Sequence, residues 1–219
     1  MPSPPIDPAG FFDENIPGQF LEATIRCLCD SYRLAKEECD QGYERYEGHD
    51  LLPSLRRAKF DGQWRGVAAR FDSLTASAES NQAKNCYHTC IQGGKVVLTA
   101  SLVRHEQEIV RHAVFRETLA RSNQVYFPCL EDLAPSISPD ALLYAILIHG
   151  PALDSVARPQ FAHVVFPSPD IKGYVARIRL EKRYPQYFSP LEDNGVENVA
   201  DQATVEILSD ITRHSRKSI

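Results

Sequence analysis

The sequence lacks a long hydrophobic run and contains few cysteines. No uninterrupted apolar stretch reaches about 18 residues, the length that a membrane-spanning helix needs. Residues 1–8 contain neither the basic nor the apolar region of a secretion signal. Six cysteines in 219 residues are too few for a disulfide scaffold. We therefore expect a soluble, intracellular, cytoplasmic protein with reduced thiols and no membrane partner.

Positive charge is also in deficit. Lysine and arginine total 24 against 29 aspartate and glutamate residues, which gives a formal net charge of −5. This balance disfavours the uniform positive field with which proteins bind nucleic acid without sequence preference, although a local basic face remains open. The content of 43% apolar and 24% charged residues is otherwise typical of a globular domain with a sizeable core.

Several short catalytic motifs are absent. The chain has no Gly-x-Gly-x-x-Gly, Gly-x-x-x-x-Gly-Lys-Ser/Thr, His-Glu-x-x-His, Gly-x-Ser-x-Gly or Cys-x-x-Cys. Enzymes that depend on these motifs are disfavoured, and we expect no cofactor. The nearest approach to a metal signature is Cys86-x-His88-x-Cys90. Alternate positions on one strand lie too far apart to converge easily on one ion, so we expect a half-buried strand face and no metal.

Proline and apolar residues divide the chain into three parts. Five prolines within residues 1–17 predict an extended arm. Residues 18–188 are expected to form a single α+β domain, and residues 189–219 an acidic linker and a C-terminal helix. The domain opens with a long helix from about Gln19 to Tyr46. Its heptad-like seam, which packs either on the core or on another chain, comprises Leu21, Ile25, Leu28, Tyr32, Ala35, Cys39 and Tyr46.

The residues after a polar connector at 72–84 predict a sheet. Two strand-prone runs, 86–92 and 95–101, flank Gly93-Gly94 and predict a hairpin in which Thr89 lies opposite Leu98. Further strands are expected at 142–148, 161–166 and 174–180. Strands and helices do not alternate regularly. We therefore expect an α+β fold with a mainly antiparallel sheet of about five strands packed by long helices.

A second long helix is predicted from Arg104 to Gln124. On its helical wheel His112 and Arg116 lie inside the apolar arc, where an unpaired charge is costly. If this helix packs on the sheet, both side chains can approach His88 on the hairpin or His149 at a strand end. Such a cluster forms either a cationic pocket for a phosphate or carboxylate group or a buried hydrogen-bond network.

A basic helix is expected after Pro53, over residues 54–71. It carries Arg56, Arg57, Lys59 and the only tryptophan, Trp64, which suggests a face that contacts phosphates. An ordinary solvated helix face is the competing interpretation. Duplex DNA binding through this helix is a further hypothesis, which the net acidity of the chain disfavours.

Two functions from different classes fit these patterns. We favour a protein-interaction or regulatory module that binds a protein partner, or a second copy, through the N-terminal helix and the proline-rich arm. The alternative is an enzyme acting on a phosphate-bearing substrate, such as a nucleotide or nucleic acid. Its candidate catalytic residues are His88, His112, Arg116 and His149, with histidine as general acid or base and arginine holding the anion; Arg56, Arg57, Lys59 and Trp64 are candidate binding residues.

Overall fold

One sheet organises the protein. The computed structural model describes residues 7–81, 84, 86–127, 142–151, 157–188 and 205–207. Within these ranges seven strands follow one another across the sheet in chain order, and all neighbours are antiparallel except β3 and β4. The α+β class and the mainly antiparallel sheet are confirmed. The strands are β1 (Leu74–Ser80), β2 (Tyr87–Gly93), β3 (Val96–Leu102), β4 (Leu143–Gly150), β5 (Phe161–Pro167), β6 (Tyr174–Arg179) and β7 (Val205–Ile207).

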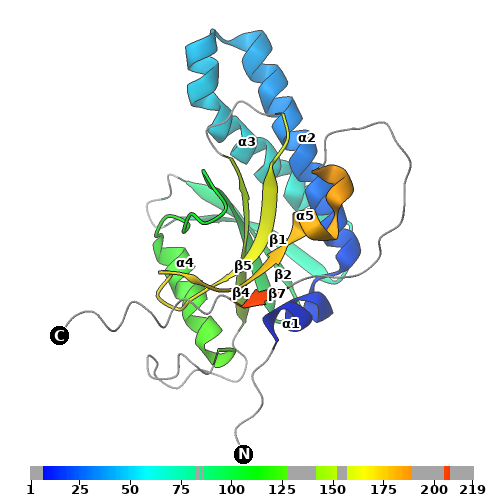
Figure 1. Cartoon of the computed structure of the whole chain (residues 1–219), viewed down its shortest axis with the longest axis vertical. Helices are drawn as coiled ribbons and strands as arrows, with labels where there is room; N and C mark the ends of the chain where they lie inside the picture. Colours follow the sequence, from blue (N-terminus) through cyan, green and yellow to red (C-terminus); the bar gives the residue numbers. More distant parts are fainter. Residues whose placement is uncertain are drawn as a thin grey trace, which may run out of the picture.

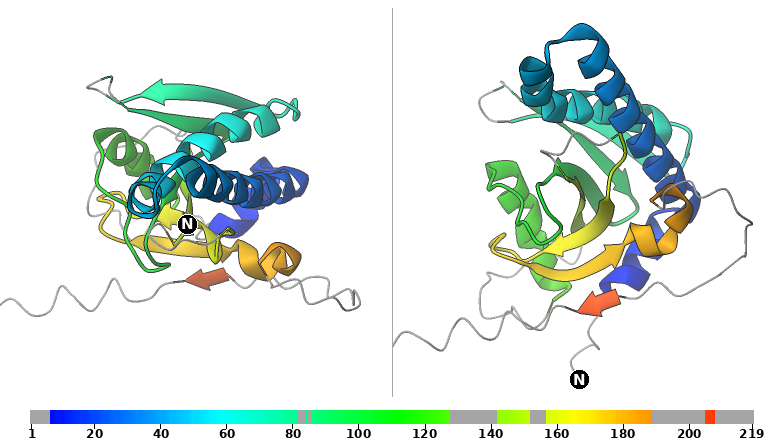
Figure 2. Two further views of the ribbon diagram at one scale, coloured as in Figure 1. Left: turned by 90° about the horizontal axis from the view of Figure 1, so that it is seen from above. Right: turned by 45° about the horizontal axis from the view of Figure 1, so that its top comes forward.

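Helices cover both faces of the sheet (Figures 1 and 2). One face packs against α1 (Pro8–Asn15), α2 (Gly18–Gly42) and α3 (Arg45–Ala68). The other face packs against the segment 103–125, which contains α4 (Val114–Ala120) and the 3-10 helix η1 (Arg121–Val125). The short helices α5 (Leu180–Arg183) and η3 (Pro185–Tyr187) follow β6.

The N-terminal segment is helical from Pro8, so the prediction of an extended arm over residues 1–17 is wrong in its described part. Asp7 caps α1, because its two carboxylate oxygens accept hydrogen bonds from the Ala9 and Gly10 N–H groups, each at 3.1 Å. Pro8 stands in the first turn, where a helix does not use the N–H that proline lacks. Phe12 is fully buried. A cap and one apolar side chain therefore turn this proline-containing stretch into a helix.

The long N-terminal helix is confirmed as α2, and its seam is covered within the chain. Tyr46 belongs instead to α3 and is 82% exposed. The seam residues pack on the core, so the seam does not provide a stripe for a second chain. The buried members are Leu21, Ile25, Leu28, Tyr32, Ala35 and Cys39.

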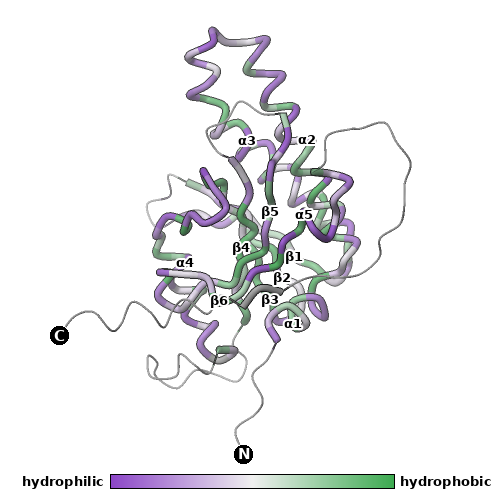
Figure 3. The backbone as a smooth tube through the Cα atoms, in the orientation of Figure 1, coloured by the Kyte–Doolittle hydropathy of each residue, from purple (hydrophilic) through white to green (hydrophobic). Residues whose placement is uncertain are grey.

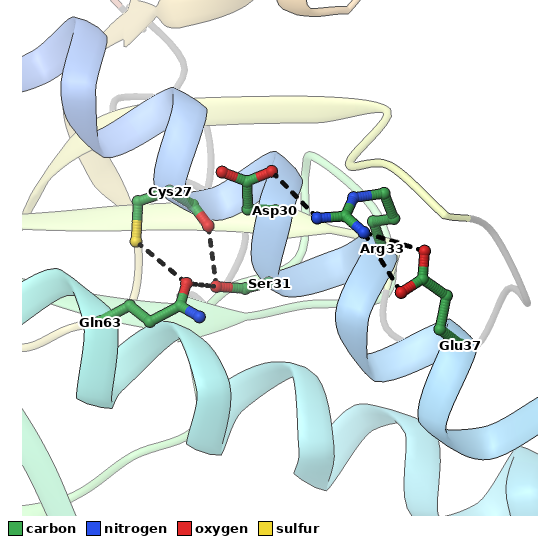
Figure 4. Close-up of polar contacts among 6 residues, drawn as sticks. All are labelled: Cys27, Asp30, Ser31, Arg33, Glu37 and Gln63. Atoms are coloured by element: carbon green, nitrogen blue, oxygen red, sulfur yellow. Dashed lines mark hydrogen bonds and ion pairs between the residues drawn. The ribbon is translucent and has the colours of Figure 1, made fainter. Parts of the chain in front are cut away.

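The two sides of α2 make different polar contacts (Figure 4). Toward α3, the Ser31 hydroxyl lies 3.1 Å from Gln63 Oε1. Away from α3, Arg33 forms ion pairs with Asp30 at 3.6 Å and with Glu37 at 2.9 Å. The first contact fixes the helix pair, and the second set faces solvent.

α2 and α3 form an antiparallel hairpin whose closed end projects beyond the sheet (Figure 1). α3 begins at Arg45 and runs through Pro53, so the predicted start after Pro53 is wrong. A proline inside a helix removes one hydrogen bond, and packing against α2 compensates for that loss here. Hydrophilic residues predominate toward the end of the hairpin (Figure 3). No helix in the described ranges is long and apolar enough to cross a membrane.

The connector at 72–84 contains β1, which the sequence analysis misses, and the β2–β3 hairpin is shifted. Its closing pair is Gly93 with Val96, and Ile91 lies opposite Leu98, so the predicted pairing of Thr89 with Leu98 is wrong. The side chains nevertheless keep their predicted faces, because the partner changes by an even number of residues. Asn15 of α1 fixes the turn, since its Oδ1 accepts the Lys95 N–H at 2.9 Å.

The second long helix predicted from Arg104 to Gln124 is wrong. Residues 103–113 contain no helix, and α4 spans only Val114–Ala120. Tyr174 of β6 holds this segment instead: the Val110 N–H donates to the Tyr174 hydroxyl at 3.0 Å, and the hydroxyl donates to the Glu108 carbonyl at 3.0 Å. These two backbone groups are therefore bonded to the sheet and not within a helix.

The C-terminal part is described only at β7, which pairs with β6. The predicted C-terminal helix is wrong at Val205–Ile207, and its other residues lie outside the described ranges. The three strands expected at 142–148, 161–166 and 174–180 are confirmed as the antiparallel series β4, β5 and β6.

Candidate functional site

A cleft of about 570 Å³ opens between α3 and the polypeptide that follows β3. Four residues that the sequence analysis selects line it together: Arg57, His88, Arg116 and His149. Its volume is within the usual range of small-molecule sites, roughly 300–1,000 Å³. Other lining residues are Phe60, Asp61, Cys86, Ser101, Arg104, Glu108, Arg111 and Phe115.

Positive charge exceeds negative charge in the cleft lining. Four arginines stand there against two carboxylates, those of Asp61 and Glu108. Both carboxylates are already paired: Arg57 Nε lies 3.6 Å from Asp61 Oδ2, and Arg104 Nη2 lies 3.3 Å from Glu108 Oε1. Burial raises the pKa of Asp61 above its ordinary value. Arg111 and Arg116 are left as the excess positive charge.

Arg116 extends from α4 toward the β2–β3 hairpin and forms no ion pair with a carboxylate of the described residues. Its Nη1 donates to the Arg111 carbonyl at 2.8 Å, and its Nη2 donates to the Ser101 hydroxyl at 3.4 Å. Its Nε is buried and has no hydrogen-bond partner in the described part of the chain. These two neutral acceptors hold the guanidinium at the cleft without neutralising it.

His88 of β2 lies beside this guanidinium. Its ring stacks on Phe115, with ring centroids 3.6 Å apart and an interplanar angle of 17°. Burial, reinforced by the charge of Arg116, lowers the pKa of His88. The imidazole is therefore neutral at pH 7, and one ring nitrogen can accept a proton while the other donates one.

Arg57 fixes the opposite wall. Its Nη2 donates to the Tyr87 carbonyl at 2.7 Å and lies 2.6 Å from Cys86 Sγ. Cys86 therefore contacts a cation, and Cys90 packs against the buried apolar residues on the same face of the sheet as Val103 and Val110. In the described ranges no group of three His, Cys, Asp or Glu side chains has the arrangement of a metal site.

Comparison with known proteins gives no match. The chain matches no family model, no curated protein and no solved structure. The geometry of the cleft is therefore the basis for the function proposed below.

His149 lies where the cleft meets the core and is only 2% exposed. Its Nδ1 is 3.0 Å from the Tyr32 hydroxyl, and its ring contacts Phe60 edge to face. Burial, with a contribution from Arg56, lowers the pKa of His149 to about 3. This histidine is neutral and held by the core, so it supports the cleft and is poorly placed to shuttle protons.

The other selected residues lie away from the cleft. His112 is exposed and 3.0 Å from Glu117, because the helix that was to carry it toward the sheet does not form. Arg56 is fully buried, and its Nη1 donates to the Pro151 carbonyl at 2.9 Å. Lys59 pairs with Glu38 at 2.6 Å. Trp64 is fully buried, and its Nε1 donates to Thr24, so this ring does not line the cleft.

Sequence reasoning misses several lining residues. Arg104 and Arg111 fall in the predicted helix that does not form, and Asp61 lies among the basic residues of the predicted helix 54–71 without being a candidate there. Phe115 directly precedes Arg116, and its ring centroid is 5.1 Å from the Arg116 guanidinium carbon. An aromatic residue next to a candidate arginine is the signal in the sequence for this pair.

Proposed function

We propose that the cleft binds a small molecule through a phosphate or carboxylate group. The observation that carries this proposal is the Arg116 guanidinium in the cleft. Among the residues that the structure describes, it has no carboxylate partner, and its buried Nε has no hydrogen-bond acceptor. A charged donor in such a place is stabilised by an anion, which supplies charge-assisted hydrogen bonds that the neutral acceptors do not.

The neighbouring groups support the same ligand class. Arg111 adds a second uncompensated charge, and the Ser101 hydroxyl offers a neutral hydrogen bond. His88 supplies an imidazole that is neutral at pH 7 beside the anion position. In an enzymatic version of this proposal, His88 is the general acid or base and Arg116 stabilises the charge on the phosphate.

Isothermal titration calorimetry with pyrophosphate and with citrate tests the proposal. We expect the intact chain to bind at least one of these anions, with affinity that falls as salt rises. Arg116→Gln should weaken binding roughly 10- to 100-fold, because it removes a charge-assisted hydrogen bond. Arg121→Gln is the matched control: Arg121 directly follows the same helix, pairs with Glu117 at 2.7 Å, and does not line the cleft. Equal affinities for both variants, or no binding of either anion to the intact chain, would contradict the proposal.

A second candidate function is binding of a protein partner, and the shape of the α2–α3 hairpin favours it. The projecting end of the hairpin exposes Tyr43, Tyr46 and Leu51, which are 44%, 82% and 38% exposed. Aromatic residues on a projecting element are typical of interaction surfaces. We propose this surface in place of the α2 seam, which is buried.

Affinity capture from the native extract tests the second candidate. The chain should capture a partner in stoichiometric amount, and the double variant Tyr46→Ser with Leu51→Ser should lose that partner while it still binds pyrophosphate. Capture that is unchanged by the double variant, or the absence of any stoichiometric partner, would contradict it.

A further inference from the structure

β1 has an unpaired outer edge in the described part of the chain, and what this edge implies does not depend on the cleft. β1 is the first strand in the order of the sheet and pairs only with β2 in the described part of the chain. From Thr75 to Ser80 every residue is exposed. Figure 2 shows the β1–β2 ribbon at the margin of the molecule. A strand in this position presents backbone donors and acceptors that another strand can use.

The register fixes which backbone groups point outward. Asn81 lies opposite Cys86 when the β1–β2 pairing is continued by one residue, and its N–H donates to the Cys86 carbonyl at 2.8 Å. Hydrogen-bonded and non-bonded pairs alternate along an antiparallel ladder. The backbone groups of Thr75, Ser77 and Glu79 therefore point to β2, and those of Ala76, Ala78 and Ser80 point to the free edge.

We propose that two copies of this chain pair through their β1 strands, antiparallel, across a twofold axis at Ser77. This register places Ala76 opposite Ala78 of the second copy. Both residues point their N–H and C=O groups outward, so each Ala76–Ala78 pair can exchange both hydrogen bonds. The register that overlaps the whole strand is thus also the register in which the outward backbone groups match.

The side chains of β1 are self-complementary in the same register. Thr75 lies opposite Glu79 of the second copy, so no like charges face each other. The two Glu79 carboxylates are separated by four residues, about 13 Å at roughly 3.3 Å per residue, beyond the Debye length of about 8 Å in physiological salt. The strand also lacks the usual protection of an edge, since residues 74–80 contain no lysine, proline or glycine.

A backbone substitution distinguishes this dimer from any other. Sedimentation equilibrium of the full chain should show a concentration-dependent dimer of twice 24.6 kDa. Ala78→Pro should yield a monomer with an unchanged far-ultraviolet spectrum, because the N–H that it removes points to the free edge and not to β2. A wild-type chain that stays monomeric at high micromolar concentration, or a dimer that persists in the folded Ala78→Pro variant, overturns the proposal.

A charge swap at one exposed position tests the register. Thr75→Glu places like charges opposite each other at both ends of the interface and should raise the dimer dissociation constant roughly 2- to 30-fold. Thr75→Lys places opposite charges there and should lower it. Both variants alter the same exposed side chain, so each serves as the folding control for the other. Equal dissociation constants for the two variants would exclude this register.

Discussion

Two buried basic side chains, Arg56 and His149, illustrate how charge is handled at the scale of single residues. Arg56 stacks over the Tyr32 ring, with its guanidinium carbon 4.4 Å from the ring centroid, and donates to the Pro151 carbonyl. His149 contacts the same tyrosine at its hydroxyl group. The permanent charge of Arg56 helps to keep His149 neutral.

The neutral state of His149 predicts a pH dependence of stability. The unfolded chain takes up a proton at this residue near pH 6.5, whereas burial keeps the folded state unprotonated down to about pH 3. The free energy of unfolding should therefore fall as the pH drops below about 6.5, by up to roughly 1.4 kcal/mol per pH unit. Urea unfolding between pH 7.5 and 5 measures this slope. His149→Phe should reduce the slope by about one proton; an identical slope would show that His149 is protonated in the fold.

Arg56 and Lys59 are three positions apart on α3, yet they should respond differently to substitution. Arg56→Met leaves the buried Pro151 carbonyl without its donor and should lower the free energy of unfolding by about 1–3 kcal/mol. Lys59→Met breaks only a partly exposed ion pair and should cost less than about 1 kcal/mol. Chemical denaturation of both variants checks this contrast, and similar losses would show that the Arg56 contacts contribute little.

At the scale of elements, the segment 103–113 determines the cleft wall. It brings Arg104, Glu108 and Arg111 to the cleft without forming a helix. The Tyr174 hydroxyl attaches it to the sheet by accepting the Val110 N–H and donating to the Glu108 carbonyl. The Val103 N–H, which donates to the His149 carbonyl at 2.9 Å, adds a second link. Both Val110 and Tyr174 are buried, so water cannot easily replace these bonds.

Removal of this hydroxyl should loosen the cleft wall. Tyr174→Phe should accelerate hydrogen exchange of the amides in residues 103–113 and weaken pyrophosphate binding, with a loss of stability of about 1–3 kcal/mol. Tyr187→Phe is the control, because the Tyr187 hydroxyl contacts α2 side chains instead. Unchanged exchange in residues 103–113 of the Tyr174→Phe variant would show that other contacts hold the wall.

The elements also show what the sequence can and cannot reveal. The seam of α2 up to Cys39 and the strands β4, β5 and β6 are predicted correctly, because their hydrophobic periodicity is local and strong. The segment 104–124 has enough apolar residues for a helix, but the Tyr174 hydroxyl that holds it comes from a distant strand. β1 is missed because Thr75, Ala76 and Ser77 have no apolar alternation, and its strand conformation depends on pairing with β2.

At the scale of the whole molecule, the cleft is a product of elements that are distant in sequence. α3 brings Arg57, β2 brings His88, and α4 brings Arg116. The sequence suggests that Arg116 approaches His88, because a charge in the apolar arc of a helix needs a partner. Arg57 is a candidate for a separate reason, as part of a basic helix face. The sequence also suggests that His112 approaches His88, and that prediction fails because it depends on the phase of a helix that is absent. A helical wheel gives the direction of a side chain only for residues that lie within a helix, and His112 lies before α4 begins.

The pKa of His88, measured by nuclear magnetic resonance with and without pyrophosphate, tests the central claim most directly. In the free chain, burial and the charge of Arg116 hold this pKa below its ordinary value. An anion bound between His88 and Arg116 favours the protonated imidazole, so saturating pyrophosphate should raise the pKa of His88, and Arg116→Gln should abolish that effect. A His88 pKa that stays constant while pyrophosphate binds would contradict the account, because the anion would then lie elsewhere.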